Sequence, residues 1–204
     1  KEPETLEWID SFEENKIFWD IGANIGSYSL YAGLTKNIQI ICFEPSYVNL
    51  DLLSKNIRLN KLNNKISIFP IPLSNISSSV EFKISDITPG SALSSITSYD
   101  QNGKPINEMH SFNTFSTSSD DLIDLFNLPQ PDYIKIDVDG IEHLILKGAI
   151  KILQNTKSIL LETNFNFEDQ YLAIDRILKE NGFLLHSKFF FNGSTQCNAI
   201  WNKV

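Results

Sequence analysis

Short apolar runs alternate along the chain with longer stretches in which apolar residues recur at helical spacing. The apolar runs predict strands at residues 17–21, 38–44, 66–71, 133–138 and 158–162. The stretches of helical period predict helices at residues 25–34, 48–59, 121–126, 142–153 and 169–180. Alternating strands and helices are typical of a mostly parallel sheet that carries helices on both faces. The pattern therefore predicts a doubly wound α/β fold.

The C-terminal end and the middle of the chain depart from this alternation. Residues 183–191 and 197–201 both have strand character, and Asn192-Gly193 lies between them, which predicts an antiparallel hairpin. The segment between Ser74 and Ser119 is rich in Ser, Asn and Thr and alternates only over residues 80–84. We expect one edge strand there, within an otherwise irregular insertion.

Length and composition favour one soluble domain. The chain has 204 residues, of which 42% are hydrophobic, and this size suffices for a core without metal or disulfide support, so we predict a single domain over residues 1–204. No apolar run is long enough to span a membrane. Cys42 and Cys197 lie far apart in apolar runs without metal-ligand spacing, which predicts buried free thiols and favours a cytoplasmic protein.

The charge balance argues against nucleic acid as a partner. The chain has 17 basic and 25 acidic residues, a net charge of −8, and its only arginines are Arg58 and Arg176. Binding to a phosphate backbone needs clustered Lys and Arg, and bidentate contacts need Arg in particular. No basic stripe is present, so we predict no nucleic-acid partner.

The first predicted strand ends in a glycine-containing turn, Asp20-Ile21-Gly22-Ala23-Asn24-Ile25-Gly26. In a parallel sheet, ligands bind beyond the carboxyl ends of the strands, and glycines there allow close approach of the backbone. The following helix N-terminus offers free N–H groups to an anion. A plain tight turn is the alternative, and the third glycine of a dinucleotide fingerprint is absent.

The second predicted strand ends in Glu44, which follows Gly22 by 22 residues. At this offset a carboxylate can accept hydrogen bonds from both ribose hydroxyls of a nucleotide. Glu44 has an alternative interpretation as a solvated acid at a strand end. Together the turn and Glu44 indicate a cofactor that contains a nucleoside, without specifying which one.

Several acids follow the strand over residues 133–138. Asp137, Asp139 and Glu142 surround one strand-to-helix turn, and Glu162 ends the next strand. Because like charges raise one another's pKa, such a cluster favours a cationic ligand or a metal ion. The spacing excludes an EF-hand.

These segments, taken in order, resemble one family, the FkbM family of S-adenosylmethionine-dependent methyltransferases. The matching motifs are Asp20-Ile21-Gly22-Ala23-Asn24, Phe43-Glu44-Pro45, residues 56–60, Leu73-Ser74-Asn75, residues 135–142 and Leu160-Leu161-Glu162. The resemblance implies a class I methyltransferase fold, Rossmann-like, with a seven-stranded sheet that ends in an antiparallel hairpin. It also implies O-methylation of a hydroxyl group on a sugar, glycan or natural product. Asp139 departs from the family, in which Glu is more frequent at this position.

The resemblance also implies roles for individual residues. S-adenosylmethionine would bind with its methionine part against residues 22–24 and Asp137, its ribose on Glu44, and its adenine near Pro45, Ser46 and the Leu73-Ser74 turn. The sulfonium and ammonium groups of this cofactor would be compensated by Asp20 and Asp137. Gly26 completes the predicted cofactor set.

Methyl transfer to a hydroxyl needs an acceptor for its proton, and the candidates are Asp137, Glu162 and His143. His143 has an alternative interpretation as an exposed residue in the first turn of a helix. A metal-dependent reaction would use the oxygen ligands Asp137, Glu162 and Asn164. Residues 85–118, with Tyr99, His110, Phe112 and Phe115, are the predicted acceptor-binding insertion, because long irregular segments are commonly functional.

Two other function classes remain open. A Rossmann-like, NAD-dependent oxidoreductase would also use Gly22 and Glu44, although the acids near Asp137 would oppose a pyrophosphate. A non-catalytic domain that retains the fold is the second alternative. The sequence names neither the methyl acceptor nor the oligomeric state.

Overall fold

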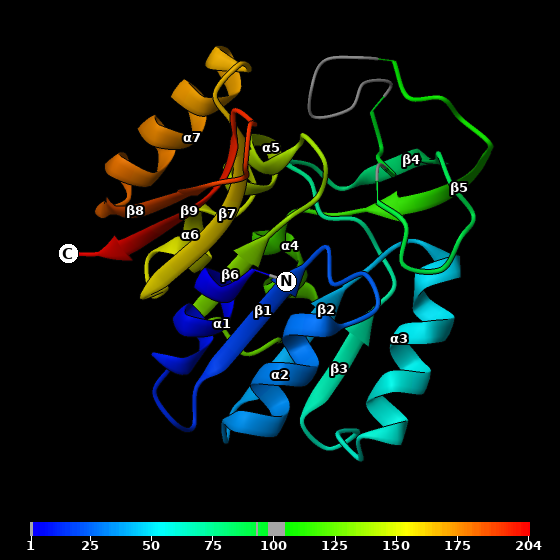
Figure 1. Ribbon diagram of the computed structural model, residues 1–204, viewed down its shortest axis with the longest axis horizontal. Coiled ribbons are helices and arrows are strands. Elements are labelled where there is room, and N and C mark those ends of the chain that lie inside the picture. The colour runs from blue at the N-terminus through cyan, green and yellow to red at the C-terminus, as the bar shows by residue number, and fades with distance from the viewer. Residues whose placement is uncertain (1, 93, 98–104) are drawn as a thin grey trace.

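The computed structural model describes residues 2–92, 94–97 and 105–204. Its main sheet has seven strands in the order β3-β2-β1-β6-β7-β9-β8 (Figure 1). The strands are β1 (Ile17–Ile21), β2 (Gln39–Phe43), β3 (Ile66–Phe69), β6 (Tyr133–Ile136), β7 (Ser158–Asn164), β8 (Phe183–Phe190) and β9 (Gln196–Lys203). Strands β3, β2, β1, β6 and β7 are parallel, whereas β9 runs antiparallel to both β7 and β8. The predicted mostly parallel sheet with a C-terminal antiparallel hairpin is confirmed.

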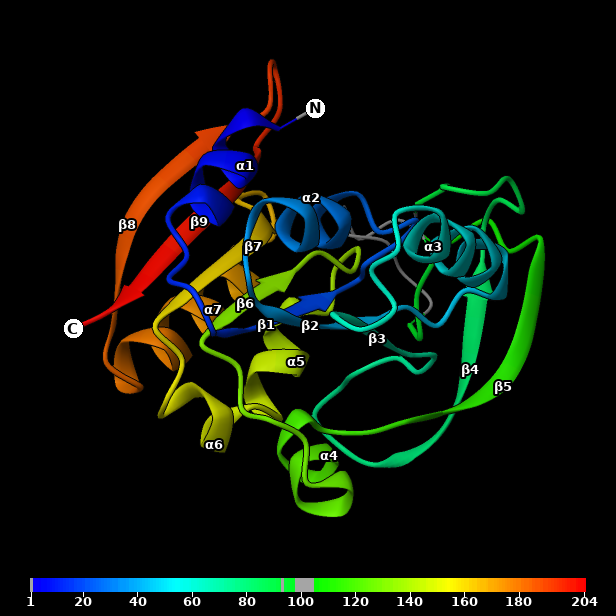
Figure 2. The same cartoon turned by 90° about the horizontal axis from the view of Figure 1, so that it is seen from below.

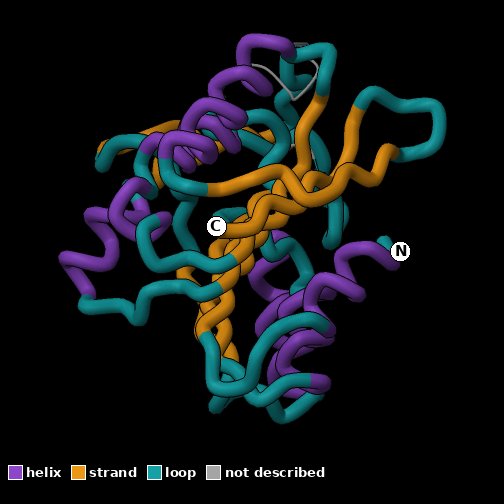
Figure 3. Tube along the Cα trace, turned by 90° about the vertical axis from the view of Figure 1, so that its left-hand side faces the viewer, coloured by secondary structure: helices purple, strands orange, loops and turns teal. Residues whose placement is uncertain are grey.

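Helices cover both faces of the sheet (Figure 2). On one face lie α1 (Pro3–Asp10), α2 (Ser27–Thr35) and α3 (Tyr47–Leu59). On the other lie α4 (Ser119–Phe126), α5 (Glu142–Lys147), α6 (Ile150–Leu153) and α7 (Glu168–Glu180). In Figure 3 the strands pass through the middle of the molecule, with helices to either side. The arrangement is therefore doubly wound, as the alternating pattern predicts.

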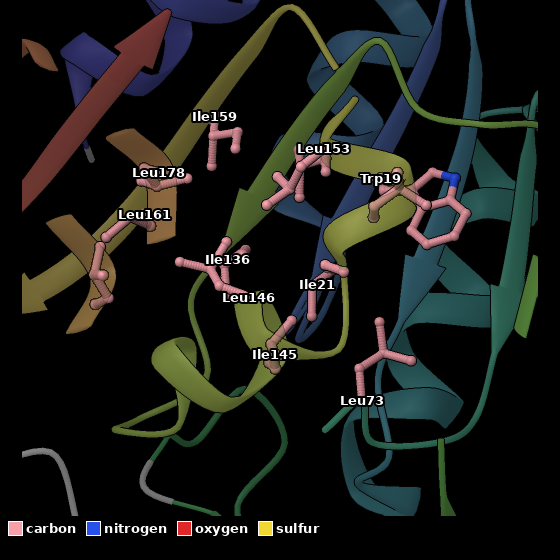
Figure 4. Close-up of a cluster of buried hydrophobic side chains, with 14 of the residues drawn as sticks. Trp19, Ile21, Leu73, Ile136, Ile145, Leu146, Leu153, Ile159, Leu161 and Leu178 are labelled. Atoms are coloured by element: carbon pink, nitrogen blue, oxygen red, sulfur yellow. The ribbon is translucent and has the colours of Figure 1, made fainter. Parts of the chain in front are cut away.

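The core has two parts because successive strand residues point to opposite faces of the sheet. Phe18 packs toward α1, α2 and α3, whereas its neighbour Trp19 packs toward the other helices. Figure 4 shows the second part, in which Trp19, Ile136 and Leu161 meet side chains from α5, α6 and α7. The short β6 is buried at all four positions, as expected for a central parallel strand covered on both faces.

The insertion between β3 and α4 forms a two-stranded antiparallel sheet beside α3 (Figures 1 and 2). Its strands are β4 (Ser78–Ile84), which confirms the predicted edge strand, and β5 (His110–Ser116). Phe82 and Phe112 form a cross-strand pair with ring centroids 5.6 Å apart. Phe112 also contacts Tyr47 at the start of α3, at 5.8 Å.

One predicted helix, residues 142–153, is wrong in a single respect: the structure divides it into α5 and α6 at Gly148. A Cβ atom at Gly148 would lie 2.3 Å from the Ser74 carbonyl oxygen, so the backbone crosses another segment closely here. The N–H groups of Lys151 and Ile152 then donate to the Asp120 carboxylate, which caps α6. Local periodicity does not reveal such a crossing.

The sheet order reverses at β1, because β2 and β6 pair with its two sides. In open α/β sheets this reversal opens a crevice beyond the carboxyl ends of the strands. The ends of β1, β2, β6 and β7 meet at this edge, since these strands are parallel. Within the described residues, no helix has the length and apolar character needed to cross a bilayer.

Candidate active site

A cavity of about 460 Å³ lies at the carboxyl ends of the central strands, a size typical of small-molecule sites. Eight residues predicted from sequence line it: Gly22, Ala23, Asn24, Glu44, Pro45, Leu73, Asp137 and Glu162. The other predicted residues are not part of its lining: Asp20, Gly26, Ser46, Ser74, His143 and Asn164. Most of the predicted site is therefore brought together, from segments at or after the carboxyl ends of β1, β2, β3, β6 and β7.

The turn after β1 is shaped by Gly22, whose φ angle of +80° is unfavourable for other residues. A Cβ atom there would lie 1.9 Å from the carbonyl oxygen of Asp137. The Gly22 and Ala23 N–H groups both donate to the Phe43 carbonyl, at 2.9 and 3.1 Å. The glycine thus lets the turn pack directly against the end of β6. Gly26, with φ +87°, serves α3 packing instead, because a Cβ atom there would lie 2.5 Å from Leu53.

Glu44 is 5% exposed and its carboxylate is held by backbone groups. Oε2 accepts from the Asn24 N–H and Oε1 from the Ser46 N–H, both at 2.8 Å. Burial raises the pKa of this carboxyl to about 7, against the lowering effect of those hydrogen bonds. The Asn49 side chain also bonds this carboxylate, and the lone-pair capacity that remains lets Glu44 accept from hydroxyl groups in the cavity.

Asp20, by contrast, lies sealed beneath the turn. Its Oδ2 accepts from Ser29 Oγ at 2.6 Å, and its Oδ1 is 4.0 Å from Lys135 Nζ. Lys135, only 2% exposed, donates to Asp137 Oδ2 at 2.8 Å and lines the cavity. Asp20 therefore stabilises the buried Lys135 rather than facing the cavity.

The acids at the ends of β6 and β7 crowd together as predicted. Burial and the neighbouring carboxylates of Asp137, Glu142 and Asp139 raise the pKa of Glu162 to about 9. Glu142 is itself buried, with Oε1 accepting from Gly140 N–H at 3.1 Å and Oε2 from Gln170 Nε2 at 2.7 Å. Glu142 thus holds the turn, while Asp137, Asp139 and Glu162 face the cavity.

His143 and Asn164 serve other contacts. Burial and the nearby Lys147 lower the pKa of His143, which lies half-buried outside the cavity lining. Asn164 Oδ1 accepts from the Asn166 N–H at 3.0 Å and from Thr195 Oγ1 at 2.8 Å, which ties β7 to the β8–β9 hairpin. Among residues 2–92, 94–97 and 105–204, no group of three or more His, Cys, Asp or Glu side chains is placed to hold a metal ion.

Part of the predicted acceptor insertion reaches the cavity. Residues 90–92 and 94–96, called the strap below, line it. Asn24 Nδ2 donates to the Ser91 carbonyl at 3.1 Å, and Asn49 Oδ1 accepts from the Gly90 N–H at 2.8 Å. His110, Phe112 and Phe115 lie on β5 away from the lining. Tyr99 lies outside the described residues.

Other lining residues were not predicted from sequence. Lys135 carried a signal, because it precedes Asp137 by two positions and period-two side chains share a face. No sequence signal points to Glu2, Leu6 and Tyr28 as lining residues. Glu2 and Leu6 reach the cavity because α1 packs on α2, the helix that contains Tyr28. Asn49 belongs to the first turn of α3 and holds the strap.

The residues that line the cavity fit a nucleoside cofactor that carries positive charge. Asn24 Oδ1 is buried without a hydrogen-bond partner among the described residues, which is costly unless a ligand donates to it. The lining includes five carboxyl groups, Glu2, Glu44, Asp137, Asp139 and Glu162, and one lysine. Apolar side chains such as Phe43, Ile71 and Leu73 supply a surface for a flat base.

A family comparison agrees with this geometry. The model of the methyltransferase FkbM domain matches residues 20–185, and the chain belongs to this family. A curated relative, the hexuronic acid methyltransferase AglP of Haloferax volcanii, is 26% identical over 154 residues. The match covers 76% of this chain but only 58% of that protein, so the chain spans less than two thirds of the relative's length.

Solved structures share the fold. A precorrin-6y C5,15-methyltransferase from Geobacter metallireducens matches with a TM-score of 0.58 at 14% identity, covering 99% of this chain and 87% of the other. An rRNA methylase from Streptococcus thermophilus matches with a TM-score of 0.59 at 10% identity, covering 98% and 93%. The chain therefore has the Rossmann-like fold of class I methyltransferases.

Proposed function

We propose that this protein is an S-adenosylmethionine-dependent methyltransferase that methylates a hydroxyl group on a sugar, glycan or natural product. One observation carries the proposal: a single cavity combines the Gly22 turn, the buried Glu44 carboxylate and the Asp137–Glu162 pair. Membership of the FkbM family supports methyl transfer, and the relative named for a hexuronic acid supports a sugar acceptor. The NAD-dependent alternative is not favoured by these relatives.

The proposed role of the cavity residues is to bind the cofactor and the acceptor and to orient them. When bound, the cofactor supplies an electrophilic methyl group for in-line displacement. Residues 22–24 would contact its methionine part and Glu44 its ribose hydroxyls, while Pro45 and Leu73 would flank the base. Ser46 and Ser74 are buried behind these two, so they act by fixing the backbone. The strap lines the cavity and would hold the acceptor near the methyl group, because positioning supplies much of the rate in such a transfer.

Asp137 and Glu162 would remove the proton of the acceptor hydroxyl. The neighbouring acids make Glu162 hold a proton near neutral pH. A positive charge brought into the cavity lowers the pKa of this carboxyl, so that it loses its proton and becomes an acceptor. Lys135 donates to Asp137 Oδ2 at 2.8 Å and holds this carboxyl group in place beside Glu162.

The proposal is tested in two steps. Calorimetry should show binding of S-adenosylhomocysteine and not of NAD(H). A methyl-transfer screen against hydroxylated sugars, nucleotide sugars and glycolipids, read by mass spectrometry, should then find a product in which one methyl group replaces one hydrogen atom of the acceptor. Tight binding of NAD(H) without S-adenosylhomocysteine would contradict the proposal.

We further propose that the reaction needs no divalent metal. Asn164, one of the three oxygen ligands considered, is committed to Asn166 and Thr195. Exhaustive chelation and dialysis should therefore leave turnover unchanged. Loss of activity that Mg²⁺ or Ca²⁺ restores would show that Asp137 and Glu162 bind a metal.

A further inference from the structure

The far wall of the cavity is built by α1 and α2, which no cofactor prediction included. Glu2, at the start of α1, and Tyr28, in the first turn of α2, both line the cavity. The Tyr28 hydroxyl donates to Glu2 Oε2 at 2.5 Å, and Asn198 Nδ2 donates to the same oxygen at 3.2 Å. Two donors, one from α2 and one from β9, therefore fix the position of the Glu2 carboxylate.

Tyr28 also contacts the lysine of the cavity. The Lys135 Nζ atom lies 5.0 Å from the centroid of the Tyr28 ring, a cation–π distance. An ammonium group has three N–H donors, and among the described residues Asp137 takes one. Burial acts to lower the pKa of Lys135, but Asp137, Asp20 and Glu2 raise this pKa by a larger amount. The lysine therefore stays charged, and the charge of Glu2 contributes to its pKa.

One tyrosine thus has a carboxylate on its hydroxyl side and an ammonium group over its ring, within the same cavity. This pairing is complementary to an α-amino-acid group, which carries one ammonium and one carboxylate on a single carbon. Of the two residues expected to compensate the cofactor's positive charge, Asp137 lines the cavity, whereas Asp20 is held below the turn by Ser29 and does not line it.

We propose that Glu2 and Lys135 bind the α-amino-acid end of the cofactor, Glu2 accepting from its ammonium group and Lys135 donating to its carboxylate, with Tyr28 as the positioning residue between them. The inference rests on the proposed function, because it requires S-adenosylmethionine as the cofactor. It makes α1 part of the cofactor site.

Three nucleosides separate the contributions of the two charged residues. S-adenosylhomocysteine has the complete amino-acid end, its decarboxylated analogue has only the amine, and methylthioadenosine has neither group. Wild type should bind S-adenosylhomocysteine roughly tenfold to a hundredfold more tightly than either truncated nucleoside, as measured by calorimetry. Equal affinity for S-adenosylhomocysteine and the decarboxylated analogue would overturn the role of Lys135.

The Glu2→Gln variant tests the carboxylate. It should lose at least about tenfold in affinity for S-adenosylhomocysteine and retain wild-type affinity for methylthioadenosine. Glu4→Gln is the matched control, because Glu4 lies on the same helix and accepts from Asn198 at 3.0 Å but does not line the cavity. Wild-type binding of S-adenosylhomocysteine by Glu2→Gln, or an equal loss for methylthioadenosine, would overturn the inference.

Lys135→Met and Tyr28→Phe complete the test. Lys135→Met should bind S-adenosylhomocysteine and the decarboxylated analogue equally, and Tyr28→Phe should weaken S-adenosylhomocysteine binding by a smaller factor than Glu2→Gln. If Lys135→Met does not fold, the wild-type comparison of the two nucleosides still decides its role. Binding of no nucleoside by wild type would instead contradict the proposed function itself.

Discussion

The two sides of the cavity differ in how they are built. On the β1–β2 side, Gly22 and Glu44 are fixed by backbone contacts: the turn packs on the Asp137 carbonyl, and two N–H groups hold the Glu44 carboxylate. On the β6–β7 side, Glu162, which holds a proton near neutral pH, faces Asp137 beside Lys135. The first side has a fixed shape, whereas the second has an electrostatic balance that a ligand can change.

This difference predicts a division of labour. A rigid side with aligned acceptors suits recognition of ribose hydroxyls, which carry no charge. A side whose proton occupancy depends on nearby cations suits the step in which a hydroxyl proton must leave. Substitutions of Glu44 and Glu162 should therefore be separable, because a change at Glu44 should affect binding and a change at Glu162 should affect turnover.

Gly22→Ala should have the largest effect. The new Cβ atom would lie 1.9 Å from the Asp137 oxygen at a φ of +80°, so the two sides must move apart. We expect a loss of at least about 3 kcal/mol in the free energy of unfolding, with no measurable binding of S-adenosylhomocysteine.

Gly193→Ala is the matched control, because Gly193 also has a positive φ, +71°, but a Cβ atom there would have nothing within 4 Å. Urea unfolding should show a loss of only about 1–2 kcal/mol for it. Equal losses in the two variants would show that the close contact carries no energy.

Glu162→Gln should have the next largest effect. It removes a proton acceptor and nearly preserves shape, so kcat should fall by about 10²- to 10⁴-fold while the affinity for S-adenosylhomocysteine changes little. His143→Gln serves as the control, since His143 lies outside the cavity, and its kcat should equal that of wild type. If His143→Gln loses kcat and Glu162→Gln retains it, the assignment of the proton acceptor is reversed.

Glu44→Ala should weaken binding by about 1–3 kcal/mol, the energy of hydrogen bonds to a buried carboxylate. Because methylthioadenosine also contains the ribose, calorimetry should show a similar loss for that nucleoside and for S-adenosylhomocysteine. This result differs from the one expected for Glu2→Gln, which spares methylthioadenosine. Affinities equal to those of wild type would show that the ribose lies elsewhere.

The pH dependence of stability should show the smallest effect when it is expressed per pH unit. The folded protein raises the pKa of Glu162 from 4.5 to about 9, so it binds this proton more tightly than the unfolded chain does. The resulting stability is complete below about pH 4.5 and is lost as the pH rises towards 9. Glu44 and Glu142, with pKa values raised to about 7, act in the same direction at lower pH.

A comparison of wild type with Glu162→Gln by urea unfolding between pH 7 and 9 separates the contribution of Glu162 from those of Glu44 and Glu142. Without ligand, the free energy of unfolding of wild type should fall with pH more steeply than that of Glu162→Gln, by less than about 1.4 kcal/mol per pH unit. Parallel curves for the two proteins would mean that Glu162 is ionised throughout this range.

Much of the fold is predictable because its signals are local. The apolar period separates β1 from α2, and Asn192-Gly193 marks the turn between β8 and β9. The division of the helix at Gly148 is not predictable in this way, since it depends on where Ser74 crosses. The packing of α1 against α2 could not be predicted from the sequence for the same reason, because it joins two segments with no shared sequence pattern.

The sequence by itself determined where the strands end and which residue types lie there, since Gly22, Glu44, Asp137 and Glu162 lie at or near the carboxyl ends of strands, and a parallel sheet aligns these ends at one edge. Only the tertiary structure decided which polar groups face the cavity. It sealed Asp20 beneath the turn against Ser29 and brought Glu2 to the cavity wall through Tyr28. The physical reason is that the positions of the strands follow from local periodicity, whereas exposure to a cavity depends on how distant helices and loops pack around it.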